Sequence, residues 1–195
     1  MPACWNCGEP PRDVHFCALC GRLQPPPENY FDFFNLERKL GIDAAELDRR
    51  FYALSRRLHP DLFFRREERE RGYSLEASAV LNDAYRTLKD PVRRAEYLLK
   101  ENGFDVGEQK SSNVPPELLE EVFELNMALE ESRGEEIQAA LAKFGRMLGD
   151  SDRELERQFE RYDASLDRAA LADIRALLNR RKYIRNLIET AAGTR

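Results

Sequence analysis

Four cysteines near the start of the chain have the types and the spacing of metal ligands. They form two Cys-x-x-Cys pairs, Cys4 with Cys7 and Cys17 with Cys20, with nine residues between the pairs. Two such pairs supply the four thiolates of a tetrahedral Zn²⁺ site. A glycine follows each pair and lets the chain turn so that backbone N–H groups face the sulfurs. Because four sulfurs leave no open position on the metal, the pattern predicts a structural Zn²⁺ site and not a catalytic one.

Two other interpretations of the cysteines are weaker. Two disulfides would need an oxidising compartment, which nothing in the sequence indicates. A redox Cys-x-x-Cys comes singly, at the start of a helix in a βαβ unit that is absent here. His15 is a further potential ligand, although four cysteines already suffice. Residues 1–27, which end in three prolines, therefore form a small module that we expect to be ordered largely by its metal.

A second group of candidate functional residues is the tripeptide His59-Pro60-Asp61. Pro60 disfavours helix at His59 and ends the helix that precedes it. This places His59 at a helix C-terminus and Asp61 in an exposed loop. Alone, the tripeptide is a weak signal, because His-Pro at the end of a helix is a common stop.

The helix before this loop carries two different stripes. Asp43 is expected to cap it, and apolar residues recur at helical spacing along its buried side. These residues are Leu47, Phe51, Leu54 and Leu58. A different face carries two pairs of arginines, Arg49, Arg50, Arg56 and Arg57. Such a face suits docking on an acidic surface, although charge alone would favour an ordinary solvated face.

The elements that position these residues are predicted to be helical throughout. The charged residues are mostly helix formers and β-branched residues are scarce, so we expect an all-α protein. Around the loop we expect four helices. They are a short aromatic-rich helix from Tyr30, the arginine-bearing basic helix that ends at Leu58, a long helix over about 67–89 and a short helix from Asp90-Pro91. Farther on, three helices with short connections, over about 118–129, 135–166 and 168–190, predict an antiparallel bundle.

The arrangement around the loop resembles the J-domain of DnaJ-type co-chaperones. The residues that carry the resemblance are Tyr30, the Arg49–Leu58 helix, His59-Pro60-Asp61, Asn82-Asp83-Ala84-Tyr85, Asp90-Pro91 and Tyr97. In that family the basic helix and the tripeptide dock on the ATPase domain of a seventy-kilodalton heat-shock chaperone and promote ATP hydrolysis. The resemblance implies that Arg49, Arg50, Arg56, Arg57, His59, Pro60 and Asp61 bind a DnaK/HscA-like ATPase. It also implies that Asp61 accepts hydrogen bonds from a guanidinium of that partner.

A J-domain, a short linker and a small bundle are together similar to the HscB/Jac family of iron–sulfur cluster co-chaperones. The corresponding limits are a four-Cys module at 1–27, a J-domain at 28–102, a linker at 103–116 and a bundle at 117–195. In that family one face of the bundle binds an IscU-type scaffold protein. The matching positions are Leu119, Phe123, Glu124, Glu131 and Tyr183, with Met127 and Glu120 departing from the residue types usual there. Helix spacing alone would favour core packing for Leu119 and Phe123.

Charge and composition argue against other classes of protein. The net charge is −5, with 15 basic and 15 acidic residues in 28–101, and 13 basic and 17 acidic in 117–195. The first 27 residues have two of each. The basic excess of nucleic-acid binders is missing, which disfavours the alternative of a zinc-module nucleic-acid-binding protein.

Membrane and enzyme classes are not expected either. No run of about 18 apolar residues is present. A phosphate-cradling glycine loop and a nucleophile–base pair are both missing. Within the co-chaperone class, the open alternative is a J-protein with a different client. The start of the chain lacks a secretion or transit pattern, so we expect bacterial cytoplasm, or the mitochondrial matrix if the chain is a processed form.

Overall fold

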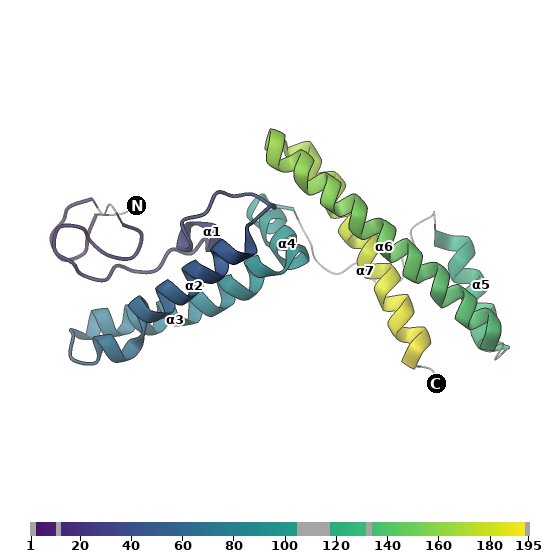
Figure 1. The fold of residues 1–195 in the computed structure, drawn as a ribbon, viewed down its shortest axis with the longest axis horizontal. Coiled ribbons are helices and arrows are strands. Elements are labelled where there is room, and N and C mark those ends of the chain that lie inside the picture. The colour runs from purple at the N-terminus through teal and green to yellow at the C-terminus, as the bar shows by residue number, and fades with distance from the viewer. Residues whose placement is uncertain (1–2, 11–12, 105–117, 132–133, 194–195) are drawn as a thin grey trace. The chain divides into compact units, whose positions relative to one another are not determined.

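The computed structural model describes residues 3–10, 13–104, 118–131 and 134–193 (Figure 1). Within them the fold is all-α, as the sequence predicts. The elements are α1 (Tyr30–Phe33), α2 (Ala44–Leu58), the 3₁₀ helix η1 (Pro60–Phe63), α3 (Glu68–Lys89), α4 (Pro91–Glu101), α5 (Leu119–Glu130), α6 (Gly134–Ser165) and α7 (Arg168–Gly193). The chain divides into two compact units, Met1–Tyr97 and Leu98–Arg195, and the division falls inside α4.

The domain limits expected from the sequence stay predictions. Of the expected linker at 103–116, residues 105–116 lie outside the described part of the chain. Among the described residues, no helix is both long and apolar enough to cross a membrane.

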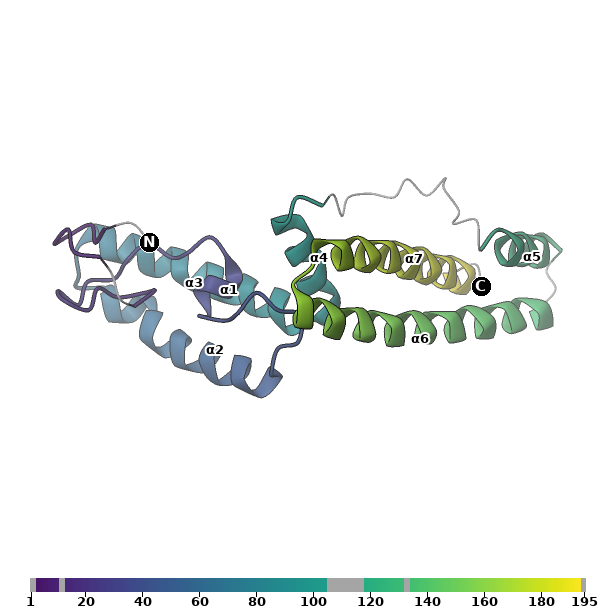
Figure 2. The same ribbon diagram turned by 90° about the horizontal axis from the view of Figure 1, so that it is seen from above.

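In the first unit α2 and α3 lie side by side as a hairpin (Figures 1 and 2). The side chain of Asp43 accepts hydrogen bonds from the backbone N–H groups of Ala45 and Glu46, which satisfies two of the donors exposed at the start of α2. The buried side of α2 consists of Leu47, Leu54 and Leu58, and that of α3 includes Ala77, Leu81, Ala84 and Leu88. Both series follow helical spacing, so the hairpin is held by two matching apolar stripes.

The open end of the hairpin is fixed by aromatic and polar contacts to α1 and α4. The rings of Tyr30 and Tyr97 stack at 4.5 Å, and the Tyr30 backbone N–H donates to the Tyr97 hydroxyl at 3.0 Å. The Arg94 guanidinium donates to the carbonyl of Leu88 near the end of α3. These contacts give a physical role to Tyr30 and Tyr97, two of the residues on which the J-domain resemblance was based.

The second unit is built from α5, α6 and α7. The long helices α6 and α7 lie side by side, and α5 packs on α6 (Figure 2). One buried cluster joins them and contains Leu118, Val122, Leu125, Phe144, Ile184 and Ala191. Between α6 and α7 the chain reverses at Leu166, which has a φ of 54°, and the Asp167 carboxylate then accepts from the N–H of Ala169 at 2.9 Å. The expected three-helix bundle is therefore present.

Candidate functional site

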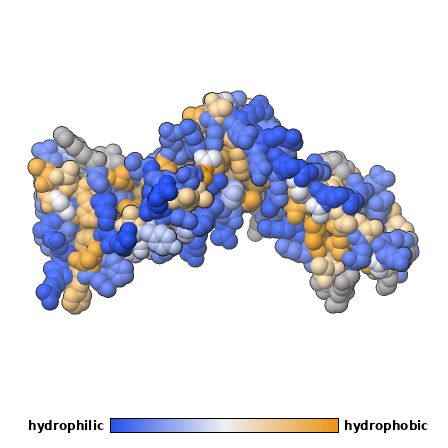
Figure 3. Space-filling view, in the orientation of Figure 1, coloured by the Kyte–Doolittle hydropathy of each residue, from blue (hydrophilic) through white to orange (hydrophobic). Residues whose placement is uncertain are grey.

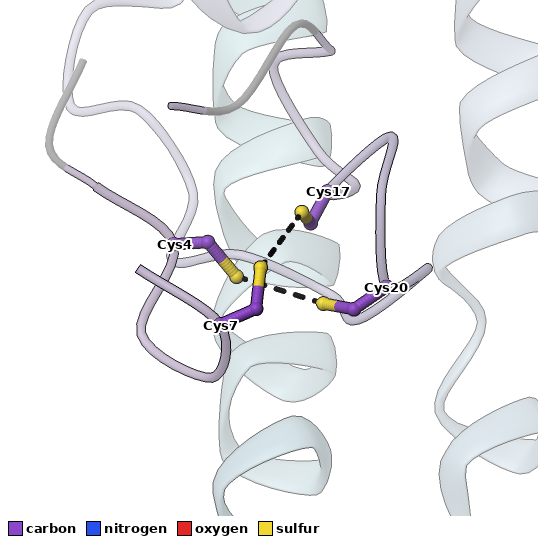
Figure 4. Close-up of side chains that lie close together, drawn as sticks. All are labelled: Cys4, Cys7, Cys17 and Cys20. Carbon is purple, nitrogen blue, oxygen red and sulfur yellow. Dashed lines mark hydrogen bonds between the residues drawn. The ribbon is translucent and has the colours of Figure 1, made fainter. Parts of the chain in front are cut away.

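The four cysteines of the first unit converge on one point. Figure 4 shows their side chains pointing toward one another, and the four sulfurs all lie within 4.8 Å of each other. The Sγ atoms of Cys4 and Cys20 are 3.7 Å apart, and those of Cys7 and Cys17 are 3.6 Å apart. A tetrahedral ion with metal–sulfur bonds of about 2.3 Å needs sulfurs about 3.8 Å apart, so these two pairs of sulfurs already have the spacing that Zn²⁺ requires. All four thiols are free, which argues against the disulfide alternative.

Two equivalent turns bring the sulfurs together. In the first, the N–H of Gly8 donates to the carbonyl of Cys4 at 2.9 Å, and in the second the N–H of Gly21 donates to that of Cys17 at 2.8 Å. Both glycines have positive φ, 76° and 68°, a conformation that disfavours a side chain. The glycine after each cysteine pair therefore has the turning role that the sequence predicted.

Burial and hydrogen bonding shift the pKa values of two of the thiols in opposite directions. Burial works against ionisation of Cys4, but backbone hydrogen bonds from Cys7 and Asn6 outweigh it and lower the pKa of Cys4 to about 6. At Cys7 the backbone N–H of Glu9 favours the thiolate, but burial and the neighbouring thiols outweigh it and raise the pKa of Cys7 to about 12. A divalent cation would supply the positive charge that lets all four sulfurs ionise together.

His15 does not join the cysteine cluster. Its ring is buried, its Nε2 lies 2.9 Å from the backbone carbonyl oxygen of Phe33, and it packs edge-on against the Phe33 ring. Burial lowers the pKa of His15. The side chain therefore packs the module against α1, and the four cysteines remain the ligand set.

The His59-Pro60-Asp61 loop lies at the closed end of the α2–α3 hairpin. Nδ1 of His59 accepts from the Asp61 N–H at 3.3 Å, and Phe63 is buried beneath the turn. The Asp61 side chain is 89% exposed. The carbonyl of Leu58, which the end of α2 leaves without a helical partner, accepts from the buried Ser74 hydroxyl at 2.7 Å. The loop is thus anchored from below, while its acidic side chain faces solvent as expected.

The four arginines expected to share one face of α2 have different contacts. Arg50 donates to the carbonyls of Phe34 and Asn35 at 2.8 and 2.6 Å, so it ties α2 to the loop after α1. Arg49 pairs with Glu46, and the Arg57 guanidinium lies over the ring of Phe16. Arg56 is exposed at the last turn of α2. Arg56 is therefore an exposed cation next to the loop, and Arg50 has a structural role that helix spacing did not indicate.

Exposed apolar side chains lie beside the loop, and the sequence analysis did not identify Leu62 or Leu75 among them. Leu62, Phe64 and Leu75 are all strongly exposed for large apolar residues. Phe64 and Leu75 line a shallow hollow together with Pro60, Asp61 and Arg71. Leu75 lies in α3, far from the tripeptide in sequence, so only the folding of the hairpin brings it to the loop.

The first helix of the second unit has an outward apolar stripe. Leu119 is 54% and Phe123 is 63% exposed, and Met127 one turn farther along is also exposed. The spacing i, i+4, i+8 places the three on one face of α5. Core packing of Leu119 and Phe123, which helix spacing alone favoured, is wrong, because Leu118, Val122 and Leu125 face the core instead. Figure 3 shows apolar patches within a mostly hydrophilic surface.

The remaining residues expected to bind a scaffold protein have mixed environments. Glu124 is exposed and lies 3.9 Å from the Lys143 ammonium, and Glu131 is exposed just after α5. Tyr183 of α7 is half-buried against the core cluster, and burial raises its pKa. The role of these three residues stays a prediction.

Two family models match the chain. The DnaJ domain model matches residues 29–97, and the model described as the HSCB C-terminal oligomerisation domain matches residues 114–192. The first contains the His59-Pro60-Asp61 loop and the second contains the exposed stripe of α5. The predicted resemblance to a J-domain followed by an HscB-type bundle is confirmed.

Similar proteins and structures agree with these matches. The human iron–sulfur cluster co-chaperone protein HscB is 30% identical over 194 residues, covering 96% of this chain and 80% of that protein. A co-chaperone protein HscB homolog of Vibrio vulnificus is 36% identical over 141 residues, covering 71% and 78%. The crystal structure of human HscB matches with a TM-score of 0.73 at 30% identity over 98% of this chain and 97% of that one. HscB from Vibrio cholerae matches with a TM-score of 0.56 at 30% identity, covering 85% and 96%. The chain therefore belongs to the HscB family of iron–sulfur cluster co-chaperones.

Proposed function

We propose that this protein stimulates the ATPase of a DnaK/HscA-like heat-shock chaperone and presents an IscU-type iron–sulfur scaffold protein to it, performing no chemistry itself. The observation that carries the proposal is the exposed His59-Pro60-Asp61 loop at the end of a helical hairpin, in a chain of the HscB family.

The loop has the chemistry of a docking point for a guanidinium of the partner chaperone. The exposed carboxylate of Asp61 would accept a charge-assisted hydrogen bond from a partner guanidinium. Arg56 would add attraction to an acidic surface, and the hollow beside Phe64 and Leu75 would bury apolar contact area. Stimulation follows if these contacts are stronger in the hydrolysis-competent state of the chaperone, because binding then shifts its population toward that state.

The α5 stripe has the chemistry of a client surface. A row of exposed apolar side chains is costly to leave in water, and such rows commonly mark binding sites. Leu119, Phe123 and Met127 would supply most of the affinity for the scaffold protein. The carboxylates of Glu124 and Glu131 would set its orientation, and Tyr183 is the proposed contact from α7.

The metal of the four-cysteine site is proposed to be Zn²⁺ in a structural role. Cys4, Cys7, Cys17 and Cys20 would hold it, and when bound it would cross-link the two turns of the module. A segment of this size has little core, so the cross-link would contribute directly to its folding.

Two alternative functions make different predictions. A J-protein for another client would keep the chaperone contact but would not recover an IscU-type scaffold protein in a pull-down. A nucleic-acid-binding protein would need a basic surface, and the first 27 residues carry two basic and two acidic groups. Bacterial cytoplasm remains the predicted compartment, with the mitochondrial matrix as the alternative.

The deciding experiment is the steady-state ATPase rate of a DnaK/HscA-like chaperone. It is measured alone, with this protein, and with this protein plus an IscU-type scaffold. We expect stimulation by the protein and further stimulation when the scaffold is added. No stimulation in either case would refute the chaperone role, and stimulation without any effect of the scaffold would favour the other-client alternative.

A further inference from the structure

The metal module packs against the start of α3 through a buried carboxylate. Glu70 is 2% exposed. Its Oε2 lies 2.5 Å from Nη1 of Arg22, and its Oε1 accepts from the backbone N–H of Leu23 at 3.1 Å. The other arm of Arg22 reaches Glu67 at 2.7 Å. A buried carboxylate is tolerated where such partners satisfy it, and both of these partners of Glu70 belong to the module.

A second contact joins the module to the end of α2. The Arg57 guanidinium lies 4.9 Å from the ring centroid of Phe16 and 3.6 Å from Oδ2 of Asp13. A third contact places Trp5 edge-on to Tyr73 of α3, with the Arg69 guanidinium 5.0 Å from the Trp5 ring. The module therefore contacts both of the helices that flank the His59-Pro60-Asp61 loop.

The residues that make these contacts are placed by the metal-binding turns. The carbonyl of Arg22 accepts from the N–H of Cys17 at 2.9 Å, which closes the second turn. Trp5 lies between Cys4 and Asn6, and its Nε1 donates to the carbonyl of Leu23 at 2.7 Å. If the metal leaves, the turns lose their cross-link, and Arg22, Leu23 and Trp5 lose the geometry that the contacts require.

A short path then connects Glu70 to the loop. Ser74 is one helical turn after Glu70, and its hydroxyl donates to the carbonyl of Leu58 at 2.7 Å. Leu58 immediately precedes His59, and Arg57 immediately precedes Leu58. Ser74 and Leu58 are the two residues that anchor the loop. Glu70 and Arg57, which contact the module, thus lie within one helical turn of them.

We propose that the module is a metal-dependent clamp on the chaperone-binding end of the hairpin. Metal binding by the four cysteines is coupled, through Arg22, Leu23 and Glu70 on one side and Arg57 on the other, to the order of the last turn of α2 and the first turns of α3. Metal loss loosens this end of the hairpin. A fall in ATPase stimulation on metal loss rests on the proposed chaperone role, whereas the coupling itself rests only on metal binding by the four cysteines.

Hydrogen exchange of the full-length protein tests one direction of the coupling. Amides of residues 55–58 and 72–78 are compared in the Zn²⁺-loaded protein and after chelation. We expect exchange there to become about tenfold faster without the metal, within the usual range of coupling between sites. Amides of α6 and α7 are the internal control and should not change. Faster exchange confined to residues 3–24 would overturn the proposal.

The reverse direction is tested by metal affinity, because coupling between two sites is reciprocal. Zn²⁺ affinity is measured by competition with a chromophoric chelator for Glu70→Gln and for the control Glu68→Gln, an exposed neighbour on α3. We expect binding about tenfold weaker for Glu70→Gln and within about twofold for Glu68→Gln. Equal affinity of the two variants would overturn the proposal. Should Glu70→Gln fail to fold, the exchange comparison on the unmodified chain still decides. Neither measurement contains a chaperone, so failure here and failure of the proposed function are separate results.

Discussion

Truncating the exposed side chains of α5 tests whether this face binds a partner or only supports the core. In the free protein Phe123 is 63% exposed. An aromatic side chain has about 150–250 Å² of surface, so about 100–150 Å² of Phe123 remains for a partner to cover. At about 25 cal/mol per Å² that area corresponds to about 2.5–4 kcal/mol. Ordering of the side chain and the Cβ retained in alanine reduce the figure, and we expect Phe123→Ala to cost about 2 kcal/mol of scaffold binding, roughly thirtyfold in Kd.

The stability of the same variant should hardly change. An exposed side chain loses little packing on truncation, so the free energy of unfolding should fall by about 0.5 kcal/mol or less. Phe144, which is fully buried in the same unit, provides the contrast. Phe144→Ala should destabilise the protein by about 3–5 kcal/mol, because it removes a buried ring and leaves a cavity.

The assay is isothermal titration calorimetry with an IscU-type scaffold protein, together with thermal unfolding of each variant. A matched control for Leu119→Ala is Leu166→Ala, since Leu166 is 59% exposed in the turn between α6 and α7 and Leu119 is 54% exposed in α5. Leu119→Ala should weaken binding and Leu166→Ala should not. A loss below about threefold for Phe123→Ala, where about thirtyfold is expected, or equal losses for the two leucine variants, would refute the assignment of this face.

The remaining predictions concern the loop, the basic helix and the metal. Asp61→Asn should abolish ATPase stimulation at an unchanged melting temperature, with Asp83→Asn as an exposed control on α3. Arg56→Glu should weaken ATPase stimulation most at low salt, without altering the free energy of unfolding. Arg50→Gln should lower the free energy of unfolding by about 1 kcal/mol, because two backbone carbonyls lose their donor. Cys17→Ser should lower the zinc content from one ion per chain to none, as measured by elemental analysis, while helical circular dichroism falls little.

Local patterns in the sequence were sufficient to predict the helices and the cluster of four cysteines. Asp43 and Pro60 mark the ends of α2 because capping and the proline ring act on their immediate neighbours. The spacing of the cysteine pairs, with a glycine after each, likewise determines two local turns that bring four sulfurs together. These features depend on residues a few positions apart, so the sequence alone can reveal them.

The tertiary structure decided which face of each helix is buried and which distant segments are in contact. Helix spacing identified an apolar pattern on α5 but could not tell that Val122 and Leu125 face the core while Leu119 and Phe123 face solvent, since that depends on where α6 and α7 lie. Helical periodicity favoured core packing for Leu119 and Phe123 because it shows that a residue lies on an apolar face and not what that face packs against.

The contact between the module and the hairpin is the clearest case of this limit. Glu70 is one acidic residue among several at the start of α3, and nothing near it in the sequence marks it as buried. Its partners Arg22 and Leu23 come from a segment more than 40 residues earlier. The sequence by itself determined the helices, the His59-Pro60-Asp61 loop and the group of four cysteines. Only the fold decided that the four-cysteine module packs against Glu70 and Arg57, next to the residues that anchor that loop. A carboxylate becomes buried through the packing of distant segments and not through its neighbours along the chain.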